Sequence, residues 1–268
     1  MGPTSGDIEI VEAKLARAKA HAADFVDTWT KFVESGAYGV AFNMDPDPPH
    51  ALHWRWKVRA QAANERRVLT ELGLIFGDML TNLRATLDYL VWQLVLAARN
   101  SPTGEHAFPC VKLPRDWASA KGRRLVGIDP AWVDEIEKLQ PYHRTDKPER
   151  HLFAVLDYVN NVNKHRTLPA VIVTAPRFAS RIESLDMPGR TLHLDNFLDR
   201  PIEDGVEFWR MLWDPPLDKL DVTPDSKLPL RVAFRDGLDH SDGWSYTNGN
   251  LVEWVESAVA VFRPAFPS

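Results

Sequence analysis

The longest regular signal in the chain is a helical pattern that begins at Glu65 and ends at Arg99. Apolar residues recur there at spacings of three and four, which is typical of an amphipathic helix with one broad apolar stripe. The stripe consists of Leu69, Leu72, Phe76, Met79, Leu80, Leu83, Leu87, Leu90, Val91 and Leu94. Because so long a stripe needs cover, we expect this central helix to pack on two or three others.

Shorter helical patterns occupy residues 7–35, 132–139, 148–164 and 250–262. Asp129 and Pro130 precede the second of them, and an aspartate cap followed by proline is a common helix start. After Arg166 the residue pattern changes from helical periodicity to short β-rich segments separated by proline, glycine and aspartate. This pattern predicts an antiparallel sheet. These segments are Leu168–Thr174, Arg181–Leu185, Thr191–Leu194, Val206–Leu212 and Leu228–Arg235.

The predicted fold class is therefore α+β. A mainly helical N-terminal part with a long central helix is followed by a small antiparallel sheet and a C-terminal helix. The expected division is a helical region at 1–166 and a β-rich region with the closing helix at 167–268. Residues 52–60 alternate strictly between apolar and polar side chains, as a strand does. If that strand joins the later sheet, the two regions form one continuous domain.

Composition excludes several functional classes. With 32 basic and 37 acidic residues, the formal net charge of -5 argues against a polyanion binder held by bulk charge. The single cysteine, Cys110, excludes an internal disulfide and a thiolate zinc site. No signal peptide is evident at the start, and the most apolar stretch, Leu90–Ala98, is too short to span a bilayer. We therefore expect a cytoplasmic protein without a membrane partner.

Common catalytic and cofactor motifs are also missing. The sequence has no phosphate-binding glycine loop, no nucleophile elbow and no His-Glu-x-x-His helix, so we expect no cofactor and no metal. The pair His50 and His53 is interpreted as a solvated loop pair. The acidic, glycine-rich segment Asp236–Gly243 lacks the spacing of a calcium loop and is interpreted as a turn.

One polar seam runs beside the apolar stripe of the central helix. Asp78, Asn82 and Asp88 lie within about one third of a turn of each other, with Arg84 at the margin. Arg84 and Asp88 are four residues apart and can form an ion pair. The seam is either a solvated face with that one pair, or a surface that meets another helix or a ligand.

A second polar segment ends the helical pattern of residues 148–164. Several asparagines in succession work against helix propensity there, and the basic residues that follow suit a helix C-terminus. The polar residues are Asp157, Asn160, Asn161, Asn163, Lys164, His165 and Arg166. The segment is either a fraying end with a C-cap, or a cluster that binds a phosphate or a base edge.

Four sequence blocks resemble a set of uncharacterised bacterial proteins. They are GDMLTNLRATLDYLVWQL at 77–94, FP at 108–109, LQPY at 139–142 and NVNKHRTL at 161–168. Those proteins carry a G-D-x-x-x-N-L-R-x-x-L-D-H-L helix and a closing N-x-x-K-H-R, in the same order. The resemblance covers about a third of the chain.

The helical block is in turn similar to the HEPN group (higher eukaryotes and prokaryotes nucleotide-binding). Many of its members are RNases or toxins of bacterial conflict systems that cleave RNA without a metal, often at a site shared across a dimer. Their hallmark is an arginine followed four to six residues later by a histidine. Arg84 matches the arginine, whereas Tyr89 stands where the histidine is needed. A phenol with a pKa near 10 is a poor base at neutral pH.

Three functional hypotheses follow. The leading one is a catalytically weak or inactive HEPN-like protein that binds a nucleotide or RNA. Because sites in this group are often shared across a dimer, a homodimer is a candidate assembly. Its expected ligand-binding residues are Asp78, Asn82, Arg84, Asp88, Asn160, Asn163, Lys164 and His165. The first alternative is a metal-independent RNase toxin in which Arg84 binds phosphate and His165 is the base. The second is a structural or partner-binding protein, in which the same residues form a buried network.

Overall fold

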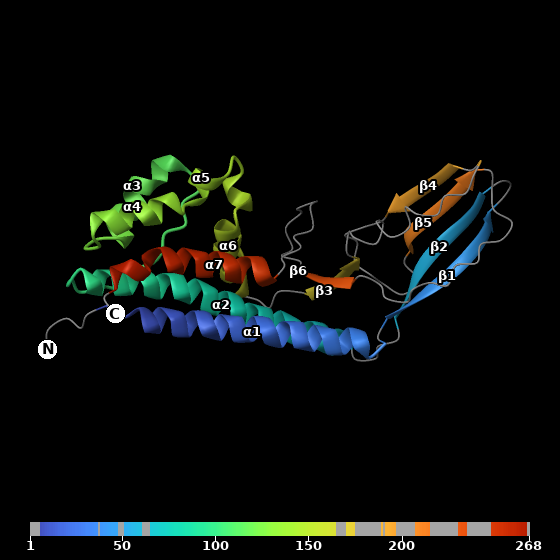
Figure 1. Ribbon diagram of the computed structural model, residues 1–268, viewed down its shortest axis with the longest axis horizontal. Coiled ribbons are helices and arrows are strands. Elements are labelled where there is room, and N and C mark those ends of the chain that lie inside the picture. The colour runs from blue at the N-terminus through green and yellow to red at the C-terminus, as the bar shows by residue number, and fades with distance from the viewer. Residues whose placement is uncertain are drawn as a thin grey trace. The chain divides into compact units, whose positions relative to one another are not determined.

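Figure 1 shows the computed structural model of the chain. It describes residues 6–36, 38–47, 51–60, 65–164, 170–174, 189, 191–196, 207–214, 230–234 and 248–266. The packing of side chains is described for the helical segments 6–36, 65–164 and 250–266.

Seven α-helices and three short 3-10 helices lie in the described residues. The two longest are α1, Ile8–Glu34, and α2, Glu65–Ala97. The others are α3 Trp117–Arg124, α4 Pro130–Lys138, α5 Pro141–Arg144, α6 Leu152–Asn163 and α7 Asn248–Phe262, with η1 Pro114–Asp116, η2 Pro148–Arg150 and η4 Arg263–Ala265. The sequence prediction for the start of α4 is confirmed: Asp129 accepts a hydrogen bond from the Ala131 backbone N–H, with Pro130 in the first turn.

Six strands are described by their backbone. They are β1 Tyr38–Asp47, β2 Ala51–Ala60, β3 Ala170–Thr174, β4 Thr191–Asn196, β5 Glu207–Asp214 and β6 Leu230–Phe234. Antiparallel pairing gives the order β1-β2-β5-β4 and a separate pair β3-β6. The register between β2 and β5 shifts between Trp56 and Lys57.

The predicted fold class is wrong. Where side-chain packing is described, 77% of the residues are helical and no sheet is present, so this part of the protein is an all-helical body rather than an α+β one. The strand expected at residues 52–60 is confirmed as β2, which forms a hairpin with β1 between α1 and α2 and pairs with β5 of the later strands. The error arose because local β propensity does not show whether strands pack on a helical core.

The chain divides into two compact units, and each is discontinuous in sequence. The first combines Met1–Asp27, Gly73–Leu168 and Tyr246–Ser268, and the second combines Thr28–Leu72 and Pro169–Ser245. The expected division had a single boundary, between residues 166 and 167. In the structure the C-terminal helix α7 belongs instead to the same unit as most of α2.

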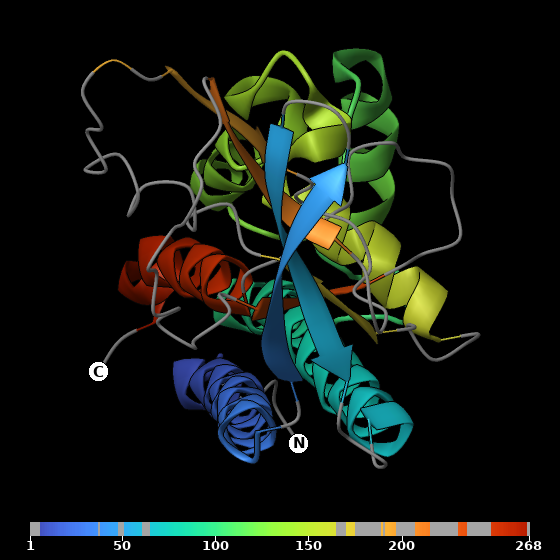
Figure 2. The same ribbon diagram turned by 90° about the vertical axis from the view of Figure 1, so that its right-hand side faces the viewer.

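The first unit is built on α2, with α1 antiparallel to it and α7 beside both (Figures 1 and 2). At one end of the α1–α2 pair, the Asp7 backbone N–H donates to Gln93 Oε1 at 2.8 Å. Towards the other end, the Phe25 and Phe76 ring centroids lie 6.2 Å apart. The helix α7 is tied to α1 by the ion pair of Lys19 with Glu256, at 2.6 Å.

Large apolar side chains fill the centre of this unit. Those that are fully buried are Phe76, Phe108, Phe153, Phe262, Met79, Leu80, Leu83, Leu87 and Leu90. Each such side chain contributes about 1.5–3 kcal/mol of burial free energy. Charged residues interrupt both long helices, and the described part of the chain contains no candidate membrane span.

Candidate functional site

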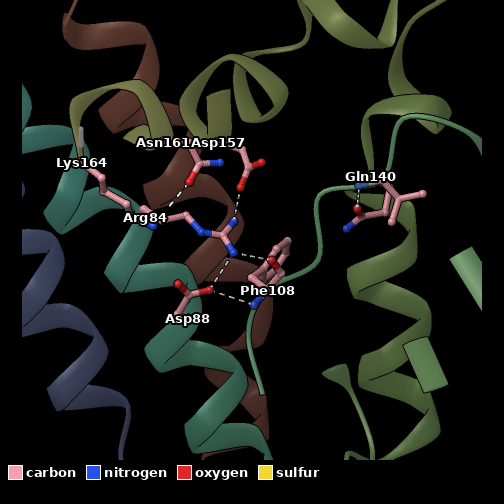
Figure 3. A network of polar contacts seen from close by, with 8 residues as sticks. Arg84, Asp88, Phe108, Gln140, Asp157, Asn161 and Lys164 are labelled. Carbon is pink, nitrogen blue, oxygen red and sulfur yellow. Dashed lines mark hydrogen bonds and ion pairs between the residues drawn. The ribbon is translucent and has the colours of Figure 1, made fainter. Parts of the chain in front are cut away.

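The helix α6 crosses α2 (Figure 3) and contacts it at Gly77, Thr81 and Arg84. Gly77 begins the contact, because a Cβ at this position would lie 2.7 Å from Nδ2 of Asn163 and nearer still to its Oδ1. One turn further along α2, the Thr81 hydroxyl donates to the Gly77 carbonyl at 3.0 Å and lies 3.4 Å from Oδ1 of the buried Asn160. A glycine inside a helix costs about 1 kcal/mol relative to alanine, and here it provides the room for the second helix.

Arg84 is the centre of a polar network between α2, α6 and the segment that contains Phe108 (Figure 3). Its Nη2 donates to Asp88 Oδ1 at 2.8 Å and to the Phe108 carbonyl at 2.6 Å. Its Nη1 forms an ion pair with Asp157 Oδ1 at 3.3 Å, without hydrogen-bond geometry. The guanidinium carbon also lies 5.6 Å from the centroid of the Phe153 ring, a cation–π distance.

This arrangement encloses the arginine and leaves its carboxylates partly open to water. The Arg84 side chain is 10% exposed, whereas those of Asp88 and Asp157 are 36% and 33% exposed. Burial raises the pKa of Asp88 above its ordinary value, although Arg84 and the hydrogen bond from the Phe108 N–H oppose that shift. One guanidinium thus faces two carboxylates, and the formal charge of the network is negative.

Both ends of the segment from Phe108 to Val111 are fixed by side chains. At one end, the Phe108 N–H donates to Asp88 Oδ1 at 2.9 Å, while its carbonyl accepts from Arg84. At the other end, the Val111 N–H donates to Oε1 of Gln140 at 2.9 Å, and Gln140 Nε2 donates to the Ile136 carbonyl at 2.9 Å. Three of the four sequence blocks that carry the family resemblance, those at 77–94, 108–109 and 139–142, therefore meet around one short segment.

Arg84 and Tyr89 lie on different faces of α2. Arg84 points towards α6 and the Phe108 segment, as Figure 3 shows. Tyr89 is 39% exposed, and its ring lies 5.3 Å from Nζ of Lys14 on α1. The arginine and the residue in the histidine position of the HEPN pattern therefore do not converge on a common reacting atom.

The structure separates the expected site residues into two groups. Arg84, Asp88 and Asn160 take part in the contacts between α2, α6 and the Phe108 segment, and Asn163 packs against Gly77. The others lie outside these contacts. Asp78 and Lys164 are exposed, Asn82 donates to the Asp78 carbonyl at 2.8 Å within α2, and Lys164 Nζ donates to Asn161 at 3.4 Å.

Some predictions concern residues that the structure does not describe. His165, the expected base, lies outside the described residues, and so do His50 and the segment Asp236–Gly243. Among the described residues, no group of three histidine, cysteine, aspartate or glutamate side chains is placed to hold a metal ion.

Sequence reasoning missed two members of the network. Asp157 was recognised as part of the second polar segment but was not assigned to the site, although it pairs with Arg84. Gln140 was not considered at all, yet it is fully buried and its amide makes two hydrogen bonds. The signal that could have found it is its place in the LQPY block, because a buried glutamine needs partners for both ends of its amide.

Residues 109–113 line a surface pocket of about 530 Å³, together with residues of η1 and α3. Three cations line it, Lys112, Arg123 and Arg124, against one carboxylate, Asp116. Cys110 also lines the pocket, and burial, together with the charge of Asp157, raises the pKa of its thiol to about 12. The thiol is therefore neutral at physiological pH and is no nucleophile.

Comparisons with protein families, with curated proteins and with solved structures find no match to this chain.

Proposed function

We propose that this chain is a HEPN-like protein that binds a nucleotide or RNA without cleaving it, and that its Arg84 network is structural. The structural role of the network is supported by the enclosure of Arg84 by Asp88, Asp157 and the Phe108 carbonyl, and the binding role by the resemblance of residues 77–168 to HEPN-like proteins. The charge of a guanidinium held in this way is neutralised by carboxylates inside the protein. It offers little to a phosphate, which would also meet the two carboxylates.

The position of Tyr89 supports the absence of cleavage. General acid–base catalysis needs a proton acceptor within hydrogen-bond reach of the reacting hydroxyl, near the group that stabilises the phosphorane. Tyr89 instead lies beside Lys14, on a different face of α2 from Arg84. Tyr89 is therefore not expected to act as the base, and the RNase alternative depends on His165, which lies outside the described residues.

The experiment incubates the full chain with a labelled single-stranded RNA in EDTA and follows binding and cleavage separately. We expect a complex to form, with no product that ends in a 2′,3′-cyclic phosphate. Cleavage that disappears in Arg84→Lys, a variant that keeps the charge, would establish the RNase alternative. If neither RNA nor mononucleotides bind or raise the melting temperature, the binding role is wrong and a structural role remains.

A further inference from the structure

Two groups of charged residues adjoin the Phe108–Val111 segment. One is the Arg84 network, with two carboxylates for one guanidinium. The other lines the pocket next to Cys110, where cations outnumber carboxylates three to one among the lining residues. If the protein binds a phosphate group, the pocket is the electrostatically favourable place for it.

The cations of the pocket are available to a ligand. Arg124 is half-buried, and its charge acts on Asp88 and Cys110 without a hydrogen bond or close ion pair to either of them. Arg123 has a partner, Glu105, at 3.8 Å, but both side chains are more than 60% exposed. An exposed pair of this kind is worth about 0–1 kcal/mol, so a phosphate can replace Glu105 at little cost.

The cations also come from two segments that face each other across the pocket. Arg123 and Arg124 end the helix α3, and Lys112 follows the fixed segment at Val111. Guanidinium groups pair with phosphate oxygens through two parallel hydrogen bonds, and a lysine adds a point charge. A doubly charged tetrahedral group matches this set better than a single carboxylate does.

The size and the remaining walls define the rest of the ligand. Pockets for organic ligands usually measure about 300–1,000 Å³, so 530 Å³ is more than an inorganic phosphate fills. Pro109, Val111, Leu113 and Ala120 give the pocket apolar walls. The neutral Cys110 thiol adds no charge to them.

We infer that this pocket binds an organic phosphate of mononucleotide size, with the phosphate held by Lys112, Arg123 and Arg124 and the organic part against the apolar walls. The inference rests on the proposed binding role and gives it a place and a ligand class. It leaves the Arg84 network free of any contact with the ligand.

The test is calorimetric titration of the full chain with AMP, adenosine and inorganic phosphate. We expect AMP to bind, adenosine to show no binding and inorganic phosphate to bind more weakly than AMP.

Arg124→Gln is expected to weaken AMP binding about tenfold or more, as the loss of a charge-assisted hydrogen bond does. Ser119→Trp should block the pocket, since Ser119 lines it and is exposed. Arg115→Gln is the matched control, because this arginine is 82% exposed and does not line the pocket.

Each other outcome decides against the inference in a distinct way. Equal AMP affinity in the wild type, Arg124→Gln and Ser119→Trp would place the ligand elsewhere and leave the proposed function intact. Inorganic phosphate binding as tightly as AMP would show that the organic part contributes nothing. RNA binding without AMP binding would overturn the inference alone, whereas failure of both ligands would overturn the proposed function as well.

Discussion

Arg84 and Arg124 both act on Asp88 and Cys110, but their guanidinium groups have different partners. The guanidinium of Arg84 is paired inside the protein with two carboxylates and one backbone carbonyl. Arg124 has no ion-pair partner among the described residues and borders an open pocket. An arginine in a family motif is therefore not by itself a ligand site. Its partners decide whether it stabilises the fold or remains available for binding.

The largest effect is expected for Arg84→Ala, which should lower the free energy of unfolding by about 3 kcal/mol. Removing one partner of a buried ion pair typically costs 3–5 kcal/mol, and the partial exposure of both carboxylates places this case at the low end. Urea denaturation measures the loss, with Arg115→Ala as the exposed control. A loss below about 0.5 kcal/mol, the size usual for surface substitutions, would show that the network is not structural.

The contact between α2 and α6 can be tested at its tightest point. Gly77→Ala improves helix propensity, but its Cβ would collide with the Asn163 amide. We expect a net destabilisation of about 1–3 kcal/mol, as for overpacked cores. The double variant Gly77→Ala, Asn163→Ala should regain most of that loss in the same denaturation experiment. Stabilisation by the single variant would mean that the helices do not pack this closely.

The start of α6 gives a pH-dependent test. His151 caps this helix by accepting a hydrogen bond from the Phe153 N–H at Nδ1, at 3.2 Å, and burial, with the charge of Arg144, lowers the pKa of its imidazole. As the pH falls below about 6.5, the unfolded chain takes up the proton first, so the folded state loses stability. The slope reaches at most about 1.4 kcal/mol per pH unit.

The variant that isolates this effect is His151→Asn, which keeps an N-cap acceptor but does not titrate. We expect a flatter dependence of the unfolding free energy on pH between about pH 7.5 and pH 5 than in the wild type. Identical slopes in both proteins would show that His151 contributes nothing to acid sensitivity.

The smallest effect on stability is expected for Arg123, which lines the pocket. Arg123→Gln should change the free energy of unfolding by less than about 0.5 kcal/mol, because the one ion pair described for Arg123 is exposed. The same variant should weaken AMP binding. Thermal melts without ligand and calorimetry with AMP measure the two effects separately. A large loss of stability would assign Arg123 to the fold rather than to the pocket.

Local features of the structure were predictable from the sequence. The apolar stripe predicted a helix from Glu65 to Arg99, and α2 runs from Glu65 to Ala97. The spacing of Arg84 and Asp88 predicted an ion pair, which is present at 2.8 Å. Both depend on helical periodicity alone, which a single sequence displays directly.

The remaining members of the network could not be predicted, because they depend on which elements meet. The Phe108 carbonyl and Asp157 reach Arg84 only after α6 and the loop have packed on α2. A backbone carbonyl leaves no residue-type signal, and Asp157 resembles any polar helix position. The fold class failed for a related reason, since strand propensity does not specify where strands lie relative to a helical core.

The discontinuity of the helical unit has a consequence for how the chain reaches its native state. Its three segments are separated by residues 28–72 and 169–245, and α7 contributes the Trp254 ring that stacks on Phe153. Contacts between such distant segments slow folding because long loops must close first. During synthesis, α7 leaves the ribosome after α1 to α6. The apolar surface that it covers therefore stays exposed to chaperones and to aggregation until α7 has emerged.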